Sequence, residues 1–206
     1  MSGTSLDGID LAQLAFTLVR GSWQFEIGAT ATIPYTSAWI NRLQKAVDFS
    51  AEALIELNVE YTQLLGQTIF DFIATHSLES IDAVCSHGHT ILHQPQNGFT
   101  LQIGNLPELA EYCQQKVVCD FRVQDVQLGG QGAPLVPIGD RFLFSAYTYC
   151  LNLGGFSNIS YEQAGQRLAF DISAVNTVLN FYAQQQGWDF DDRGALAKTG
   201  KVNMQL

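Results

Sequence analysis

The chain has few basic residues and no long apolar run. Of its 206 residues, 10 are Lys or Arg and 20 are Asp or Glu, which gives a net charge of -10. Binding to nucleic acid relies on clustered Lys and Arg, so this balance argues against a nucleic-acid partner. No apolar stretch approaches the roughly 20 residues of a membrane span, and no basic segment with an apolar core opens the chain like a signal peptide. We therefore expect a cytoplasmic protein with no membrane partner.

Cysteine is also scarce, and no two cysteines form a close C-x-x-C pair. The chain has four: Cys85, Cys113, Cys119 and Cys150. Three of them stand in apolar, strand-like surroundings. This pattern indicates reduced core cysteines of a cytosolic protein rather than disulfides or metal ligands.

Apolar residues make up 47% of the sequence, which is enough to bury a sizeable core. Their spacing predicts strands that alternate with helices. We expect strands over residues 9–18, 23–33, 81–85, 99–103, 116–119, 147–153, 158–161 and 167–170. We expect helices over residues 52–76, 107–115 and 174–186, and a short helix that contains Phe142 and Phe144. This alternation indicates an α/β fold.

Two glycine-rich turns, each next to apolar strand-like segments, are the clearest functional signal. One is Ser2-Gly3-Thr4-Ser5-Leu6-Asp7-Gly8 and the other is Gly154-Gly155-Phe156-Ser157-Asn158. Glycine lets backbone amides crowd around an anion because no Cβ stands in the way. Two such turns on similar frames predict a duplicated fold that grips a polyphosphate from both sides. The alternative is that both are ordinary tight turns between strands.

Five motifs in fixed order carry a family resemblance. They are Ser2 to Gly8, Ser86-His87-Gly88-His89-Thr90, Asp120-Phe121-Arg122, Gly129 to Pro137, and Asn152 to Ile159. In this order the chain resembles the 1,6-anhydro-N-acetylmuramic acid kinases of the sugar kinase, Hsp70 and actin superfamily. The resemblance implies a ribonuclease H-like (actin-like ATPase) domain over residues 1–145 and the beginning of a second similar domain over 146–206. Because the family's members are longer, we expect an N-terminal portion of such a protein.

The resemblance implies an amino sugar and ATP with Mg²⁺ as partners, and leaves a homodimer open. Phosphate binding is expected from residues of both turns: Gly3, Thr4, Ser5, Asp7, Gly8, Gly154, Gly155, Ser157 and Asn158. Asp7 could hold the Mg²⁺ through water, since Mg²⁺ keeps much of its hydration shell. By its motif alone, the first turn fits a simple hairpin equally well.

Asp171 is our candidate for the general base. We expect it to end the strand 167–170 and to precede a helix, where the helix N-terminus would favour the ionised carboxylate. The alternative is a plain helix N-cap. The resemblance gives Asp171 the role of activating the water that attacks the anomeric carbon of the sugar. Many family members continue with Thr-Gly-Pro-Gly, where this chain has Ile172-Ser173-Ala174-Val175.

The resemblance implies sugar contacts from His87, His89, Thr90, Arg122 and Asn176. The arginine fork suits a carboxylate such as the lactyl group of the sugar, although a salt bridge to a nearby Asp120 or Asp125 explains Arg122 equally well from sequence alone. For the histidines we favour sugar contact or loop packing over zinc, because their spacing fits no common zinc site.

Three functional hypotheses follow. The first is an ATP-dependent kinase that opens the 1,6-anhydro bond with water and phosphorylates O6 in peptidoglycan recycling. The second is a truncated or non-catalytic relative that binds the sugar or the nucleotide. The third is an actin-like or Hsp70-like ATPase, which leaves the His-Gly and Asp-Phe-Arg motifs without a role.

Overall fold

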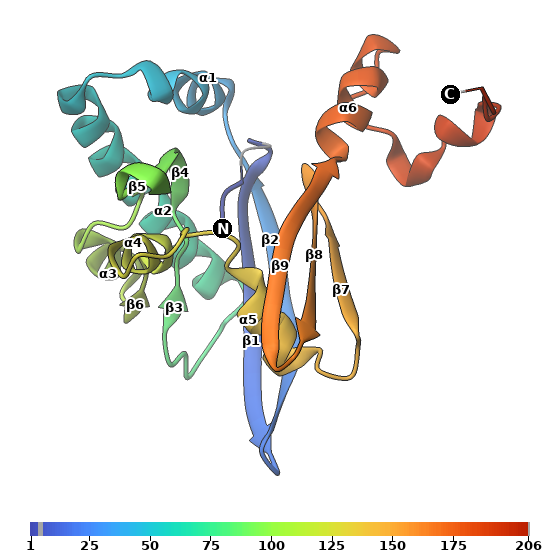
Figure 1. The fold of residues 1–206 in the computed structure, drawn as a ribbon. Coiled ribbons are helices and arrows are strands. Elements are labelled where there is room, and N and C mark those ends of the chain that lie inside the picture. Colours follow the sequence, from blue (N-terminus) through green and yellow to red (C-terminus); the bar gives the residue numbers. More distant parts are fainter. Residues whose placement is uncertain (4–5, 206) are drawn as a thin grey trace. The chain divides into compact units, whose positions relative to one another are not determined.

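The computed structural model describes residues 1–3 and 6–205, which fall into two compact units, unit 1 up to Leu135 and unit 2 from Val136 on. Figure 1 shows helices and strands following one another along the chain. The described residues form several small sheets, of which three have two strands and one has three. The expected mixture of helices and strands is therefore confirmed at this level.

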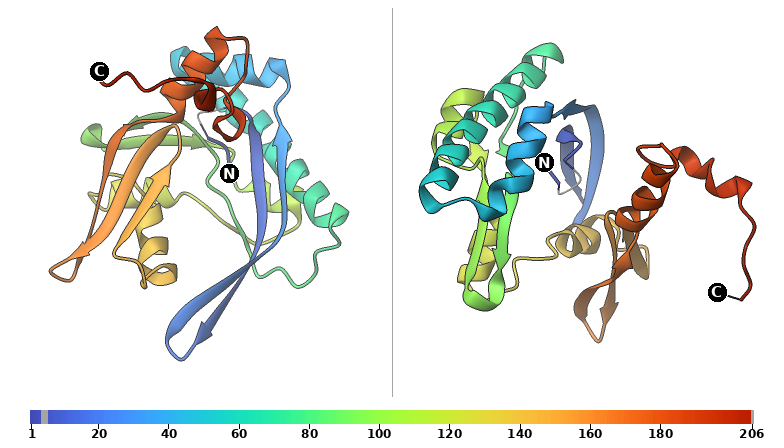
Figure 2. Two further views of the ribbon diagram at one scale, coloured as in Figure 1. Left: turned by 90° about the vertical axis from the view of Figure 1, so that its right-hand side faces the viewer. Right: turned by 90° about the horizontal axis from the view of Figure 1, so that it is seen from above.

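Unit 1 begins with a long antiparallel hairpin. Strand β1 (Gly8–Val19) pairs with β2 (Ser22–Pro34), and a bulge interrupts the register between Ala12 and Leu14. The hairpin extends as a blue ribbon in Figure 2. Arg20 and Gly21 form its turn, both with positive φ. The expected strand pair is confirmed, with each strand slightly longer than predicted.

The rest of unit 1 combines four α-helices with four short strands. The helices are α1 (Ser37–Lys45), α2 (Ala51–Thr75), α3 (Glu108–Cys113) and α4 (Phe121–Gln127). The strands are β3 (Val84–Cys85), β4 (His89–Gln94), β5 (Phe99–Ile103) and β6 (Val117–Val118). Strands β3 and β6 are parallel, and β4 and β5 are antiparallel. Short 3₁₀ helices cover Ala46–Asp48 and Pro95–Asn97.

Helix α2 forms the centre of the core of unit 1. The Ser50 side chain caps it by accepting the Ala53 N–H at 3.3 Å, as the sequence predicts. Its apolar face is buried at helical spacing and packs with residues of β1, β5 and α3. The cluster includes Leu57, Tyr61, Leu65 and Ile69 together with Ile9, Ile103, Leu109 and Cys113. This core supports the strands and loops that carry the motifs of unit 1 quoted above.

Met1 and Ser2 are held to neighbouring strands by backbone contacts. The Asp10 N–H donates to the Met1 carbonyl at 2.7 Å, and Ser2 forms a parallel β-bridge with His89. The start of the first glycine turn is therefore held to β4 by one β-bridge.

Unit 2 contains a three-stranded antiparallel sheet and two α-helices. Strands β7 (Tyr149–Leu153), β8 (Phe156–Gln163) and β9 (Gln166–Ala174) follow one another in the sheet. Helix α5 (Val136–Leu143) precedes them and α6 (Asn176–Gln185) follows. Short 3₁₀ helices cover Asp192–Gly194 and Ala197–Thr199. Phe142 lies in α5, whereas Phe144 lies just beyond it.

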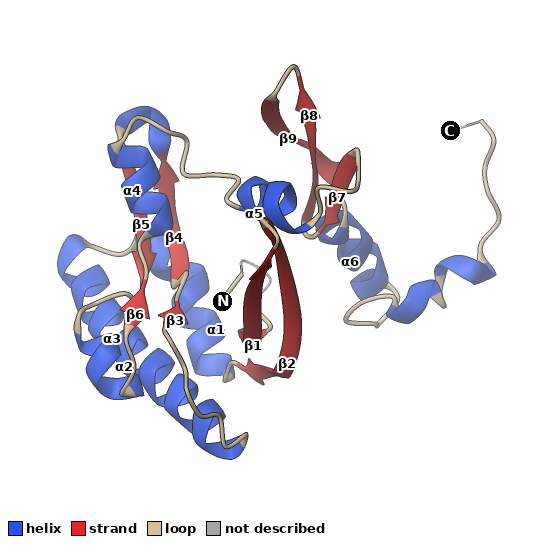
Figure 3. Ribbon diagram, turned by 90° about the horizontal axis from the view of Figure 1, so that it is seen from below, coloured by secondary structure: helices blue, strands red, loops and turns tan. Residues whose placement is uncertain are grey.

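Figure 3 labels the strands β7, β8 and β9 of this sheet, and their register places an apolar row and a polar row of residues on opposite faces. Because directly paired residues point to the same face, Leu151, Ile159 and Phe170 form one row across β7, β8 and β9. The row Asn152, Asn158 and Asp171 lies on the opposite face.

Some sequence predictions are wrong in detail. The strand expected over 81–85 is reduced to Val84–Cys85, and Cys85 is exposed. All four cysteines are free, but only Cys113 is a core residue. The apolar side of α6 is also exposed, including Val178 and Leu179. Local periodicity predicts which side of an element is apolar, but not whether another element covers it.

Candidate active site

His87 and Arg122 form the polar centre of a cluster in unit 1. The Arg122 Nε–H donates to His87 Nε2 at 2.7 Å, and Nη1 donates to the Gly132 carbonyl at 2.5 Å. His87 Nδ1 lies 3.1 Å from the Gly88 carbonyl. Since Nε2 accepts, the proton of the neutral ring is on Nδ1 and donates to Gly88. The predicted pair of substrate residues His87 and Arg122 therefore lies together.

No carboxylate of the described residues pairs with Arg122. The carboxylate of Asp125 accepts the Gly132 N–H at 2.7 Å, and that of Asp120 accepts the Asn105 side-chain amide at 3.1 Å. The salt bridge that sequence reasoning left open is therefore not formed. The guanidinium is held in place by neutral acceptors, so its charge is available to an anionic ligand.

Burial sets the protonation of this cluster. It lowers the pKa of His87, and the nearby Arg122 charge lowers it further, despite the opposing effect of the bond to Gly88. Burial also lowers the pKa of the Arg122 guanidinium. A neutral imidazole beside a partly desolvated guanidinium leaves one positive charge in the cluster, which suits a carboxylate or a phosphate.

His89 does not belong to this cluster. Its ring is 3% exposed and its Nδ1 lies 2.8 Å from Ser2 Oγ. Burial holds the pKa of His89 down to about 4, with a smaller contribution from His87. This placement favours the loop-packing interpretation of His89 over sugar contact. Thr90, next along β4, accepts the side-chain amide of Gln102 at 3.3 Å.

The first glycine turn is described only in part, because Thr4 and Ser5 lie outside the described residues. The Gly3 carbonyl accepts the Leu6 N–H at 3.3 Å. Asp7 is exposed. The pKa of Tyr35 is raised mainly by burial and slightly by the Asp7 charge, which therefore acts near that hydroxyl.

Gly8 is required by strand pairing. A Cβ there would lie 2.4 Å from the Ile33 carbonyl oxygen of the neighbouring strand. The close approach of β2 thus explains this glycine, and its predicted contact with phosphate stays a prediction.

The second glycine turn connects β7 to β8 and holds the start of α6. The Gly155 carbonyl accepts the Val175 N–H at 2.8 Å and the Thr177 N–H at 3.3 Å, while the Gly154 carbonyl accepts the Asn176 N–H at 3.2 Å. These α6 amides are therefore occupied. The Gly155 N–H, in contrast, donates to no described residue.

The backbone geometry of Gly154 does not require glycine. Its φ is not positive, and a Cβ there would meet its nearest neighbour at 3.5 Å, an ordinary contact. Packing within the described residues therefore leaves the glycine unexplained, unlike at Gly8. A backbone left open on one side is what close approach of a ligand requires.

Ser157 and Asn158 point to opposite faces of β8. Ser157 is buried and donates to the Ser173 carbonyl at 3.1 Å, which commits its hydroxyl to β9. Asn158 is directly paired with Asp171. Directly paired side chains lie about 5 Å apart at Cβ, so the Asn158 amide is within reach of the Asp171 carboxylate.

The predicted position of Asp171 at the end of a strand is wrong. Asp171 lies inside β9, which continues to Ala174, and α6 begins only at Asn176. Asp171 is therefore no N-cap and does not lie at the N-terminus of α6. The continued pairing of β9 with β8 extends the strand. Asp171 is nevertheless exposed, so solvent can reach its carboxylate.

Sequence reasoning missed Asn152 as a member of the Asn158–Asp171 row. It also missed Tyr35, which donates to Ser2, and Tyr61, which bonds to Tyr35. Only strand register could have placed Asn152 there. Tyr61 stands in the apolar stripe of α2, where an aromatic residue signals packing. Among the described residues, no three His, Cys, Asp or Glu side chains cluster as a metal site.

Comparison with known proteins decides the family. The family model of anhydro-N-acetylmuramic acid kinase matches residues 1–206. The chain belongs to this family. An anhydro-N-acetylmuramic acid kinase of Pseudomonas fluorescens (strain Pf0-1) is 38% identical over all of this chain and 58% of its own length. That of Pseudomonas putida is 40% identical over 97% of this chain and 56% of its own length.

The chain thus spans a little over half the length of these anhydro-N-acetylmuramic acid kinases. A third relative of the same name, from Hydrogenovibrio crunogenus, is 33% identical over the whole chain and 57% of its own length. The family is one of kinases, which use ATP. No helix in the described part of the chain is long and apolar enough to cross a membrane.

Proposed function

We propose that this chain is the part of an anhydro-N-acetylmuramic acid kinase that carries the sugar-binding arginine and the catalytic base. The whole enzyme would take the anhydro sugar, water and ATP, and yield the sugar 6-phosphate and ADP in peptidoglycan recycling in the cytoplasm. The observation that carries the proposal is the pairing of Asn158 with the exposed Asp171 across β8 and β9. Gly154 and Gly155, which join β7 to β8, lie in the same small sheet.

The domain assignment is part of the proposal. We infer that residues 1–145 form a ribonuclease H-like, actin-like ATPase subdomain and that residues 146–206 begin a second one. In each part a glycine turn leads into an antiparallel strand pair, β1–β2 in one and β8–β9 in the other. The parallel pair β3–β6 adds the parallel element that a sheet of this kind contains.

Asp171 is the proposed general base. Solvent reaches this carboxylate, which can accept a proton from the attacking water. The water oxygen bonds to the anomeric carbon as the bond from that carbon to O6 breaks. O6 then bonds to the γ-phosphorus of ATP, and the bond to the β-phosphate oxygen breaks to release ADP. The role proposed for Asn158, which is paired with Asp171 across β8 and β9, is to orient the carboxylate through its amide.

Phosphate binding is proposed for the glycine turns. Gly154 fits a phosphate because a Cβ there would meet only ordinary contacts, and Gly155 fits because its N–H donates to no described residue. A Mg²⁺ bound with the nucleotide would neutralise phosphate charge, and the exposed Asp7 could hold it through water. Gly3 and Gly8, with Thr4 and Ser5 outside the described residues, complete the proposed set.

Sugar binding is proposed for the His87–Arg122 cluster. The guanidinium is fixed by His87 and Gly132 and pairs with no described carboxylate, which suits the lactyl carboxylate of the sugar. Thr90 and Asn176 remain proposed contacts. The non-catalytic alternative predicts that the same arginine binds the sugar without turnover.

The test compares Asp171→Asn with Asp189→Asn in the complete protein. Asp189 is an exposed residue of the same unit and serves as a matched control. We expect Asp171→Asn to lower kcat at least about 100-fold, the smaller end of what general bases contribute, with sugar affinity within about threefold. ADP release in a coupled assay and titration calorimetry with the anhydro sugar measure the two. Near-normal turnover in Asp171→Asn would remove the proposed base, and no turnover in the wild type would favour the non-catalytic alternative.

A further inference from the structure

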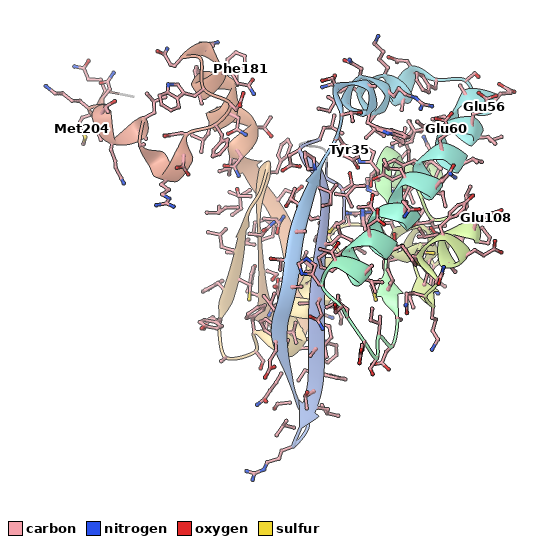
Figure 4. All side chains as sticks on the ribbon, turned by 180° about the vertical axis from the view of Figure 1, so that it is seen from behind. Tyr35, Glu56, Glu60, Glu108, Phe181 and Met204 are labelled. Atoms are coloured by element: carbon pink, nitrogen blue, oxygen red, sulfur yellow. The ribbon has the colours of Figure 1, made fainter. Side chains whose placement is uncertain are left out.

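Four buried polar side chains of unit 1 form an unbroken chain of hydrogen bonds. The hydroxyls of Tyr61 and Tyr35 are 2.6 Å apart, Tyr35 donates to Ser2 Oγ at 2.6 Å, and Ser2 Oγ lies 2.8 Å from His89 Nδ1. None of the four residues is more than 9% exposed. Tyr61 belongs to α2, Tyr35 follows β2, Ser2 begins the first glycine turn, and His89 begins β4. Figure 4 labels Tyr35 at the end of the β2 ribbon.

The donors in this chain all point the same way. Tyr35 donates its single hydroxyl proton to Ser2, so the Tyr61 hydroxyl must be the donor to Tyr35. The Ser2 proton is then left for His89 Nδ1, which makes His89 the final acceptor and puts its ring proton on Nε2. Because burial keeps His89 neutral at pH 7, Nδ1 retains the lone pair that accepts this proton. The chain is complete without any charge.

The backbone alone holds the segment before the turn by few contacts. The Met1 carbonyl accepts from Asp10, and Ser2 forms one β-bridge with His89. The Ser2 side chain adds two buried hydrogen bonds at the same place. Removing one partner would leave a buried hydroxyl unpaired, which is costly, and would loosen the segment from which the turn starts.

We propose that His89 is a positioning residue, which holds Ser2 and thereby fixes the start of the first glycine turn for phosphate binding. The inference rests on the proposed function for its ligand, but its structural part stands alone. His89 acts only through Ser2 and touches no phosphate. A glutamine at this position can still accept from Ser2 through Oε1, whereas a leucine cannot.

The first experiment measures amide hydrogen exchange of this chain. In His89→Leu we expect exchange at the amides of Asp10 and Leu6, which bond to Met1 and Gly3, to be at least about tenfold faster than in wild type. In His89→Gln we expect it to stay within about threefold. His76→Leu is the control, because His76 is exposed at the end of α2. Equal exchange in His89→Leu and His89→Gln overturns the proposal.

The second experiment measures ATP kinetics of the complete protein. Loss of positioning should raise KM for ATP at least about fivefold in His89→Leu with kcat within about twofold, and His89→Gln should restore the wild-type value. Faster exchange with unchanged KM overturns the positioning role. If the complete wild-type protein binds no ATP, the proposed function is wrong. The hydrogen-exchange comparison still tests whether His89 holds Ser2 in place.

Two further measurements keep the proposal testable if His89→Leu fails to fold. Tyr35→Phe removes only the hydroxyl that donates to Ser2, and we expect the same faster exchange at Asp10 and Leu6. Nitrogen-15 NMR of the wild type should show the His89 proton on Nε2. A proton on Nδ1 would reverse the chain and overturn the assignment.

Discussion

Unit 1 buries many of its large apolar residues, whereas unit 2 leaves most of its own exposed. All members of the buried apolar cluster belong to unit 1, from Ile9 to Cys113. In the described part of unit 2, the one buried apolar residue is Ala183, and Leu151 and Phe170 are more than half exposed. The outer half of the β1–β2 hairpin is the part of unit 1 that resembles unit 2, since Phe16 is also half exposed.

This difference separates local structure from burial. Strands β7, β8 and β9 form an antiparallel sheet, with one register shift between Ser157 and Asn158, although their apolar face is open. Backbone pairing and alternation are therefore sufficient to define these strands, whereas a core needs a second layer of side chains. Unit 1 has that layer because α2 packs its apolar stripe against strands and α3.

The largest expected effect comes from truncating one leucine in each unit, which tests whether the stabilising core lies in unit 1. Leu57 is fully buried in α2, whereas Leu151 of β7 is 56% exposed. We expect Leu57→Ala to lower the free energy of unfolding by about 3 to 4 kcal/mol, because it loses transfer energy and leaves a cavity. Leu151→Ala should cost less than about 1 kcal/mol. Urea unfolding of this chain measures both, and equal losses would contradict the assignment of the core to unit 1.

The second prediction concerns pH and the buried polar chain of unit 1. Burial lowers the pKa of His89 from 6.5 to about 4, so below pH 6.5 the unfolded chain takes up a proton that the folded chain does not. Stability is therefore complete above about pH 6.5 and falls as pH decreases toward 4. At about 1.4 kcal/mol for each pH unit, the full loss is about 3 kcal/mol.

His89→Gln should remove this part of the pH dependence. His87 also has a lowered pKa and remains in both proteins, so some dependence in the same direction should persist. The groups that face His89 are Ser2, Tyr61 and His87, and of these only His87 titrates in this range. Urea unfolding at several values between pH 4 and 7 measures the difference. Identical profiles for wild type and His89→Gln would refute the prediction.

The smallest expected effect on stability sharpens the comparison of the two glycine turns. Gly8→Ala places a Cβ against the backbone of β2 and should cost about 2 kcal/mol through overpacking. Gly154→Ala meets only ordinary contacts, and we expect a change below about 0.5 kcal/mol. In the complete protein, Gly154→Ala should nevertheless weaken ATP binding at least about tenfold. Thermal unfolding and nucleotide titration measure the two effects, and the reverse pattern would assign the open backbone to Gly8.

Sequence reasoning predicted the elements well where periodicity was strong. The hairpin β1–β2 and helix α2 with its Ser50 cap are confirmed. It was less successful where a few residues decide, as for the β3 strand and the end of β9. Asp171 was expected at the end of its strand and before a helix. Pairing with β8 instead extends β9 past Asp171 to Ala174.

The candidate site divides in the same way. The sequence by itself determined the family, the two glycine turns and the residue types available for chemistry, because these depend on the order of residues along the chain. Only the tertiary structure decided that Arg122 binds His87, that Asp171 faces Asn158, and that His89 is committed to Ser2. The physical reason is range: periodicity and turn chemistry act over a few neighbours, whereas strand register and packing join residues that are far apart in the chain.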